Sequence, residues 1–229
     1  MEDKRILDVY RERERLRKGQ NFFGYEDVSI FFRAQSRYRA TLTLLRSTGI
    51  QSLSTTRILD IGCGNGNMLR QFLQWGAKPE NLAGIELRSE PVEYALTINP
   101  NLDIRCGSAD NLPWANKAFD MVSQHTVFTS ILDHGVKKEV ASEMLRVLKP
   151  HGVIQWYDFW INPINQQTHG IRPPEIRDLF PGCNYKFRKI TLAPPLAHKV
   201  VPFSWSLAFF IEELKIFNTH YLVAITPKS

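Results

Sequence analysis

The middle of the chain alternates between short apolar runs and longer stretches in which apolar residues recur at helical spacing. The apolar runs predict strands, and the longer stretches between them, such as 67–75 and 137–148, predict helices. The expected strands are 57–61, 82–86, 102–106, 119–124 and 153–159. Strands that alternate with helices form crossover units, so this pattern predicts a mainly parallel sheet with helices on both faces.

Both ends of the chain depart from this alternation. Residues 1–20 have a helical composition with dense mixed charge, and a second helix is expected between an N-cap at Ser29 and a stop at Gly49. Residues 185–192 and 220–226 are rich in β-forming residues and are expected to pair antiparallel at a sheet edge. Between them, one helix face buried in the core is predicted by helical spacing of Leu207, Phe210, Ile211 and Leu214.

Composition limits the class of protein. With 229 residues, 43% hydrophobic and 23% charged, the chain is expected to fold as one sizeable globular core. No apolar run follows Met1 and no stretch of about 20 apolar residues occurs, so we expect a cytoplasmic protein without a membrane span. The dispersed Cys63, Cys106 and Cys183 argue against disulfides and zinc, and the histidines do not cluster with carboxylates, so no metal is expected.

The chain "RILDIGCGNGNML" at 57–69 runs from an expected strand directly into three alternating glycines, Gly62, Gly64 and Gly66. Glycines allow a tight turn and let a ligand touch the backbone, while the following helix presents free N–H groups. The spacing is GxGxG, and Asn67 stands where a dinucleotide-binding GxGxxG has its last glycine. A purely structural turn is the alternative interpretation.

The ends of the next two expected strands carry residues that could form a binding site together with the glycine loop. Glu86 ends the second expected strand about 20 residues beyond the loop, where an acid can accept hydrogen bonds from both ribose hydroxyls. Ser108, Ala109 and Asp110 follow the third strand, where an adenine edge could be recognised. The alternatives are that Glu86 pairs with Arg88 on the surface and that Asp60 caps the helix after the loop. Together, three strand ends predict a nucleoside site.

At motif level the sequence resembles the class I S-adenosylmethionine-dependent methyltransferases. "LDIGCGNG" is similar to their first motif, "IE" with Glu86 to their ribose-binding acid, "GSADNLPW" to their adenine loop, and "EMLRVLKPHGVIQWYDF" to the stretch that leads into their fifth strand. The resemblance covers roughly 56–159, and four motifs in the correct order are more specific than any one of them.

The resemblance implies a fold, a cofactor and a set of cofactor contacts. The expected fold is α/β, a doubly wound, mainly parallel, seven-stranded Rossmann-like sheet with an antiparallel edge strand and an N-terminal helical cap. Residues 1–50 would form the cap or lid, and 51–229 the methyltransferase domain, with a helical segment at 193–217 between the last two strands. The residues expected at S-adenosylmethionine are Asp60, Gly62, Cys63, Gly64, Asn65 and Gly66 at the methionine part, Glu86 and Leu87 at the ribose, Ser108 and Ala109 at the adenine, and Gln124 and Arg37.

Some of these positions carry alternatives. The family often has an acid where Ser108 stands, so Asp110 is a candidate to compensate. Arg33 and Arg37 lie four residues apart on one helix face, from which one arginine could pair with the methionine carboxylate. A solvated helix face is the alternative for this pair.

Candidate catalytic residues follow the last two parallel strands, because ligands of open α/β sheets bind beyond the carboxyl ends of the strands. His125 ends the fourth strand, and its imidazole titrates near neutral pH, which suits an acceptor-side base. Tyr157 and Asp158 end the fifth strand, where Asp158 could orient the acceptor. The alternatives are a structural histidine bonded to a carbonyl and an aspartate that caps a turn.

The leading function hypothesis is methyl transfer to a small-molecule acceptor. "PPEIRDLFPG" and "THYLVAITPK" resemble a branch of the superfamily associated with bacterial glycan and secondary-metabolite pathways. Positive charge is concentrated at the chain ends: residues 1–50 carry 11 Lys and Arg against 7 Asp and Glu, and 164–229 carry 8 against 4, whereas 51–163 carry 10 against 12. Basic flanks that meet as a lid would select an anionic acceptor. The alternatives are a solvated basic surface, an RNA methyltransferase, and a non-catalytic subunit that binds S-adenosylmethionine.

Overall fold

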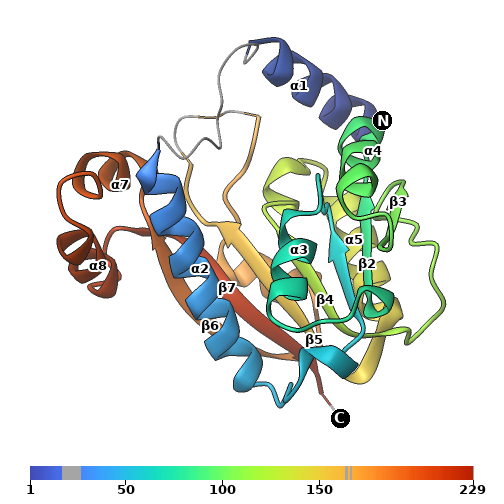
Figure 1. Cartoon of the computed structure of the whole chain (residues 1–229). Coiled ribbons are helices and arrows are strands. Elements are labelled where there is room, and N and C mark those ends of the chain that lie inside the picture. The colour runs from blue at the N-terminus through green and yellow to red at the C-terminus, as the bar shows by residue number, and fades with distance from the viewer. Residues whose placement is uncertain (17–26, 163–164, 166, 229) are drawn as a thin grey trace.

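A seven-stranded sheet forms the centre of the computed structural model, which describes residues 1–16, 27–162, 165 and 167–228 (Figure 1). The strand order is β3-β2-β1-β4-β5-β7-β6. The strands are β1 (Ile58–Ile61), β2 (Leu82–Glu86), β3 (Asp103–Cys106), β4 (Phe119–His125), β5 (Leu148–Phe159), β6 (Cys183–Leu192) and β7 (Asn218–Pro227). The predicted doubly wound, mainly parallel sheet is confirmed.

One strand runs against the others. β7 lies between β5 and β6 and is antiparallel to both, with Ile154 opposite Ile225 on one side and Phe187 opposite Val223 on the other. The predicted antiparallel pairing is therefore confirmed, and β6 rather than β7 forms the outer edge of the sheet.

Helices cover both faces of the sheet. Their bounds are α1 (Glu2–Leu16), α2 (Val28–Arg46), α3 (Asn67–Gln74), α4 (Ser89–Ile98), α5 (His134–Val147), α6 (Pro173–Leu179), α7 (Pro194–Val200) and α8 (Trp205–Glu213). None of the described helices is long and apolar enough to cross a membrane. Residues 17–20 of the helix predicted at the start of the chain, which include Arg17 and Lys18, lie outside the described residues.

The alternation of side chains along each strand divides the core into two layers. Ile58 of β1 faces a layer formed with α2, α3 and α4, in which Leu44, Leu69 and Phe72 are buried. The neighbouring Leu59 faces the opposite layer, formed with α5 and α6. Burial of both faces explains why the central strands read as continuous apolar runs.

Two predicted helix boundaries are wrong for local reasons. Ser29 does not cap α2, because Asp27 does so by accepting a hydrogen bond from the Ser29 backbone N–H at 3.0 Å. The helix predicted at 137–148 begins earlier, since the Asp133 side chain accepts from the Val136 N–H and caps α5. Leu148 already belongs to β5.

The predicted burial of one apolar face at 207–214 is also wrong. Leu207, Phe210 and Leu214 are 44%, 62% and 47% exposed, whereas Ala208 and Glu212 of α8 are buried. The Glu212 carboxylate accepts hydrogen bonds from Ser36 Oγ at 2.7 Å and from the Leu192 backbone N–H at 3.1 Å. These buried bonds fix the rotation of α8, so Leu207, Phe210 and Leu214 turn outward, while Ile211 of the predicted face packs partly against the core.

Candidate active site

The loop that follows β1 adopts a conformation that glycine permits. Gly62, Gly64 and Gly66 have φ values of 63°, 54° and 77°, in the left-handed region. A Cβ at Gly62 would lie 2.4 Å from Val127 Cγ2, whereas no atom lies within 4 Å of the corresponding position at Gly64. The loop is therefore packed closely against the β4 side at Gly62 and presents bare backbone to open space at Gly64.

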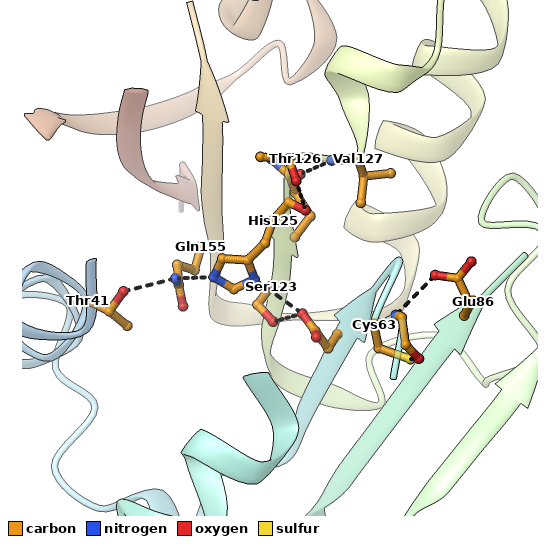
Figure 2. A network of polar contacts seen from close by, with 11 residues as sticks. Thr41, Cys63, Glu86, Ser123, His125, Thr126, Val127 and Gln155 are labelled. Atoms are coloured by element: carbon orange, nitrogen blue, oxygen red, sulfur yellow. Dashed lines mark hydrogen bonds and ion pairs between the residues drawn. The ribbon is translucent and has the colours of Figure 1, made fainter. Parts of the chain in front are cut away.

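Glu86 connects the end of β2 to this loop. Its side chain is almost buried, and its Oε2 accepts a hydrogen bond from the Gly64 N–H at 3.0 Å (Figure 2). Its Oε1 accepts from the backbone N–H and the side-chain Nε of Arg88, at 3.1 and 3.0 Å. The ion pair with Arg88 is thus present, but it lies at a buried strand end and leaves acceptor capacity on both carboxylate oxygens.

A cavity of about 640 Å³ lies at the carboxyl ends of β1, β2 and β4. Its lining comprises most of the site residues predicted from the sequence: Arg37, Asp60, Gly62, Cys63, Gly64, Asn65, Glu86, Leu87, Ser108, Ala109 and His125. The fold therefore brings residues from five separate stretches of the chain to one cavity, at the position expected for ligands of open α/β sheets.

Four other predicted site residues, Gly66, Gln124, Tyr157 and Asp158, are not part of the described cavity lining. Gln124 follows the strand alternation to the side opposite His125, where its Oε1 accepts from the Val127 N–H. The Tyr157 hydroxyl lies 2.9 Å from Thr191 Oγ1. The Tyr157 hydroxyl at the end of β5 is therefore engaged by a protein partner.

Asp158 is bound within the core. The Thr129 Oγ1 lies 2.6 Å from Asp158 Oδ1 and the Thr129 N–H donates to Oδ2 at 3.3 Å. Burial raises the pKa of Asp158 to about 7, because removal from water disfavours the carboxylate more than these bonds stabilise it.

The cavity wall also includes α1, which lies within the cap or lid expected at 1–50. Ile6, Tyr10 and Arg13 of this helix line the cavity, and the Arg88 guanidinium lies 4.2 Å from the centre of the Tyr10 ring. Dense mixed charge in residues 2–16 indicated a helix, and the resemblance placed it in a cap or lid without indicating which of its residues reach the site. The missed positions outside α1 include Asn67, Met68, Arg88, Tyr94, Val127, Ser130 and Ile131.

Besides the packing of Ile6 against the core, two hydrogen bonds attach the start of α1 to the body of the molecule. Glu2 Oε1 accepts from the Leu132 N–H at 2.6 Å, and Arg5 donates to the Ser130 carbonyl at 2.5 Å. The hydrogen bond from Arg5 is the largest of the causes that lower the pKa of Glu2 to about 2. The start of α1 is therefore fixed beside the residues that follow β4.

His125 belongs to a polar chain that crosses the sheet (Figure 2). Gln155 Nε2 lies 3.2 Å from Thr41 Oγ1 and 3.1 Å from His125 Nε2. On the other side of the ring, His125 Nδ1 lies 3.5 Å from Asp60 Oδ1, which also accepts from Ser123 Oγ at 2.6 Å. Both ring nitrogens thus face protein groups.

Burial lowers the pKa of His125, and the positive charge of Arg37 acts in the same direction, while Asp60 opposes them. The imidazole is therefore neutral at pH 7. Burial also raises the pKa of the Cys63 thiol, so this cysteine is not a thiolate at neutral pH.

Arg37 brings a half-buried cation to the cavity. Its guanidinium lies 5.2 Å from the centre of the Tyr157 ring, and its Nε is buried without a hydrogen-bond partner among the described residues. A buried, unpaired donor on a cavity wall suits an anionic ligand group.

The prediction that the two basic flanks meet over this site is wrong. The described lining residues come from positions 3 to 140, so the C-terminal flank contributes none of them. Instead, Arg188, Lys189 and Lys215 of that flank line a separate hollow beside Arg39 of α2. Because β6 lies at the edge of the sheet, the basic residues of the C-terminal flank lie away from the cavity.

Comparison with known proteins agrees with this geometry. Residues 58–152 match the methyltransferase domain family. The chain is 30% identical over 132 residues to the biotin biosynthesis bifunctional protein BioHC of Cellvibrio japonicus, covering 53% of this chain and 25% of that protein. It is 32% identical over 121 residues to the glycine/sarcosine/dimethylglycine N-methyltransferase of Actinopolyspora halophila, covering 51% of this chain and 21% of that protein.

The chain thus spans about a quarter or less of these two relatives. Among solved structures, a putative sarcosine dimethylglycine methyltransferase from Galdieria sulphuraria is similar with a TM-score of 0.60 and 17% identity, covering 85% of this chain and 86% of that one. The sheet order and the glycine loop agree with the matched segment: residues 58–152, less than half of the chain, are similar to methyltransferase domains.

Proposed function

We propose that this protein transfers a methyl group from S-adenosylmethionine to a small-molecule acceptor. The observation that carries the proposal is the buried Glu86 carboxylate, which accepts a hydrogen bond from the Gly64 N–H at the wall of a cavity that Gly62 and Gly64 also line. The two relatives described above are named for glycine and sarcosine methylation and for biotin biosynthesis, which supports acceptors of small size.

The cavity residues fit the donor group by group. Glu86 would accept from the ribose hydroxyls, and Leu87, Ser108 and Ala109 would lie along the adenine. The unpartnered Nε of Arg37 fits the methionine carboxylate. When bound, the sulfonium supplies an electrophilic methyl group, and the protein's task is to hold the acceptor in line with it.

The position of His125 supports a role in holding Asp60. A neutral imidazole that accepts a hydrogen bond from the Gln155 amide at Nε2 carries its proton on Nδ1, which faces the Asp60 carboxylate. The ring would therefore orient Asp60 toward the amino-acid part of the donor. A role as acceptor-side base stays a prediction from the sequence, which the kinetics described below distinguish from positioning.

The N-terminal helix would act as a lid over the donor. Tyr10 and Arg13 line the cavity, and α1 is attached through Glu2 and Arg5 rather than through a large apolar face. The described lining carries Arg13, Arg37 and Arg88 against Asp3, Asp60 and Glu86, so the charge of the wall alone does not select an anionic acceptor.

The experiment is incubation of the protein with S-adenosylmethionine labelled in the methyl group and with fractionated small metabolites. We expect label in a small molecule and stoichiometric S-adenosylhomocysteine, and loss of both with Glu86→Ala. Label that enters RNA, with none in small metabolites, would contradict the proposed acceptor class. Donor binding without transfer to any fraction would instead support a non-catalytic subunit.

A further inference from the structure

The outward face of α8 is apolar over a continuous surface. Leu207, Phe210 and Leu214 lie on one side of the helix and are 44%, 62% and 47% exposed, and Phe203, which precedes the helix, is 87% exposed. We call this surface, together with its exposed neighbours, the α8 patch; it comprises Phe203, Trp205, Leu207, Phe209, Phe210, Leu214, Ile216 and Phe217. Contiguous exposed apolar surfaces of this kind mark interaction sites.

The orientation of this face is fixed by polar bonds and is not a product of loose packing. Glu212 lies on the opposite side of α8, buried and bonded to Ser36 Oγ and to the Leu192 N–H. Asn218 donates to the Glu212 backbone carbonyl at 3.0 Å. Turning the apolar face inward would strand a buried carboxylate and its donors, so the exposed face is the stable arrangement.

Basic residues adjoin the patch. Arg39, Arg188, Lys189 and Lys215 line, with Phe209 of the patch, a hollow of about 390 Å³, which we call the basic hollow. The Arg39 guanidinium lies 4.8 Å from the centre of the Phe209 ring, so the basic hollow adjoins the α8 patch at Phe209. The acids at this hollow are the buried Glu212 and Glu213, which pairs with Lys215 at 3.2 Å.

The surrounding elements carry the same sign of charge. Residues 28–46 contain four Arg and no Asp or Glu, and 183–217 contain five Lys and Arg against Glu212 and Glu213. Two copies of the chain that joined through this surface would oppose the same cations, because a symmetric interface brings like patches together. The charge therefore favours an anionic partner over a second copy.

We propose that the α8 patch and the basic hollow bind the surface of an anionic phospholipid bilayer. Phe and Trp side chains next to Lys and Arg suit the boundary between acyl chains and headgroups. The nine-residue α8 would lie in the plane of that boundary, and Arg39 and Arg188 would face lipid phosphates. In Figure 1, α7 and α8 project beyond β6 and α2, at a distance from α1 and α3, so the donor cavity stays accessible.

The test is vesicle flotation with the full chain at low and high salt, using phosphatidylcholine alone or mixed with phosphatidylglycerol. We expect binding to the anionic vesicles that high salt weakens. Phe203→Ser with Phe210→Ser should reduce the partition coefficient by about tenfold or more. Arg39→Gln with Arg188→Gln should reduce it about tenfold on anionic vesicles, without effect on neutral ones.

The matched control is Ile98→Ser with Ile161→Ser, which changes apolar residues of 45% and 42% exposure outside the patch and should leave flotation unchanged. Calorimetric titration with S-adenosylmethionine checks that each variant is folded, and should give the same affinity in all of them. Failure of the native chain to float with anionic vesicles at low salt would overturn the proposal. So would a dimer in light scattering that the Phe203 and Phe210 substitutions dissociate, because the patch would then join two copies.

Discussion

The parallel half of the sheet, β3-β2-β1-β4, and the half formed by β5, β7 and β6 use buried acids in opposite ways. In the parallel half, Asp60 and Glu86 lie at strand ends and face a cavity with acceptor capacity to spare. In the other half, Glu212 is buried against Ser36 and Leu192 and serves the fold, while the apolar side chains of its helix face outward. A buried acid thus marks a ligand site only where its neighbours leave it acceptor capacity.

The largest effect on stability is expected from a Gly→Ala substitution at position 62, compared with the same substitution at position 49. Gly62→Ala places a methyl group 2.4 Å from Val127 at a positive φ, so it should cost on the order of 5 kcal/mol of unfolding free energy and abolish donor binding. Gly49→Ala, at a φ of 86° with no atom near, should cost only about 1 kcal/mol. Urea unfolding measures both. Equal losses would show that the loop at Gly62 is no more constrained than an ordinary helix end.

The next effect concerns Asp158 on β5, the strand of the second half that pairs with β4. Between about pH 4 and pH 7 the unfolded carboxyl has lost its proton while the buried one retains it, so the free energy of unfolding falls as pH rises. Asp158→Asn removes this pH dependence. Between about pH 4 and pH 7 the free energy of unfolding of the variant should therefore rise by up to about 4 kcal/mol relative to that of the native chain. Thermal or urea unfolding of both proteins at several pH values provides the measurement. Parallel curves would mean that Asp158 is ionised in the folded protein.

A third comparison uses neighbouring acids on α8. Glu212→Ala leaves the Ser36 hydroxyl and the Leu192 N–H without their acceptor and should cost about 3 kcal/mol, whereas Glu213→Ala, at an exposed site, should leave the unfolding midpoint unchanged. Donor affinity should be unchanged in both variants when folded. An equally stable Glu212→Ala would remove the reason given for the outward apolar face.

The sequence predicted the features that depend on local motifs and missed those that depend on contacts between residues distant in sequence. The glycine loop, Glu86 and the residues around Ser108 are local motifs at strand ends, and the fold brings them to one cavity as predicted. The helical spacing of Leu207, Phe210 and Leu214 correctly indicated one face. Which way that face points depends on Glu212 meeting Ser36, 176 positions away in sequence, and no local pattern reports such a contact.

The same reasoning explains the rest of the site. Gln124 and His125 are adjacent, so strand alternation sends their side chains to opposite sides and only His125 reaches the cavity. The role of α1 rests on Glu2 and Arg5 bonding to residues beyond position 129, which composition alone does not indicate.

A smaller effect separates the two hypotheses for His125. If the ring orients Asp60, His125→Ala should weaken donor affinity about tenfold, and His125→Asn, which retains a donor, should lie within about threefold of the native chain. Calorimetry and steady-state kinetics with an identified acceptor measure affinity and kcat separately. If instead both variants keep donor affinity and lose about a hundredfold in kcat, His125 is the acceptor-side base predicted from the sequence.

The central claim is that the cavity at the ends of β1 and β2 binds S-adenosylmethionine through Glu86 and the glycine loop. Its most direct test is isothermal titration of S-adenosylmethionine into the native chain and into Glu86→Ala, with circular dichroism to check that both are folded. The account predicts saturable one-to-one binding to the native chain, and a loss of roughly 1 to 3 kcal/mol of binding free energy in the variant. Unchanged affinity in a folded Glu86→Ala protein would contradict it.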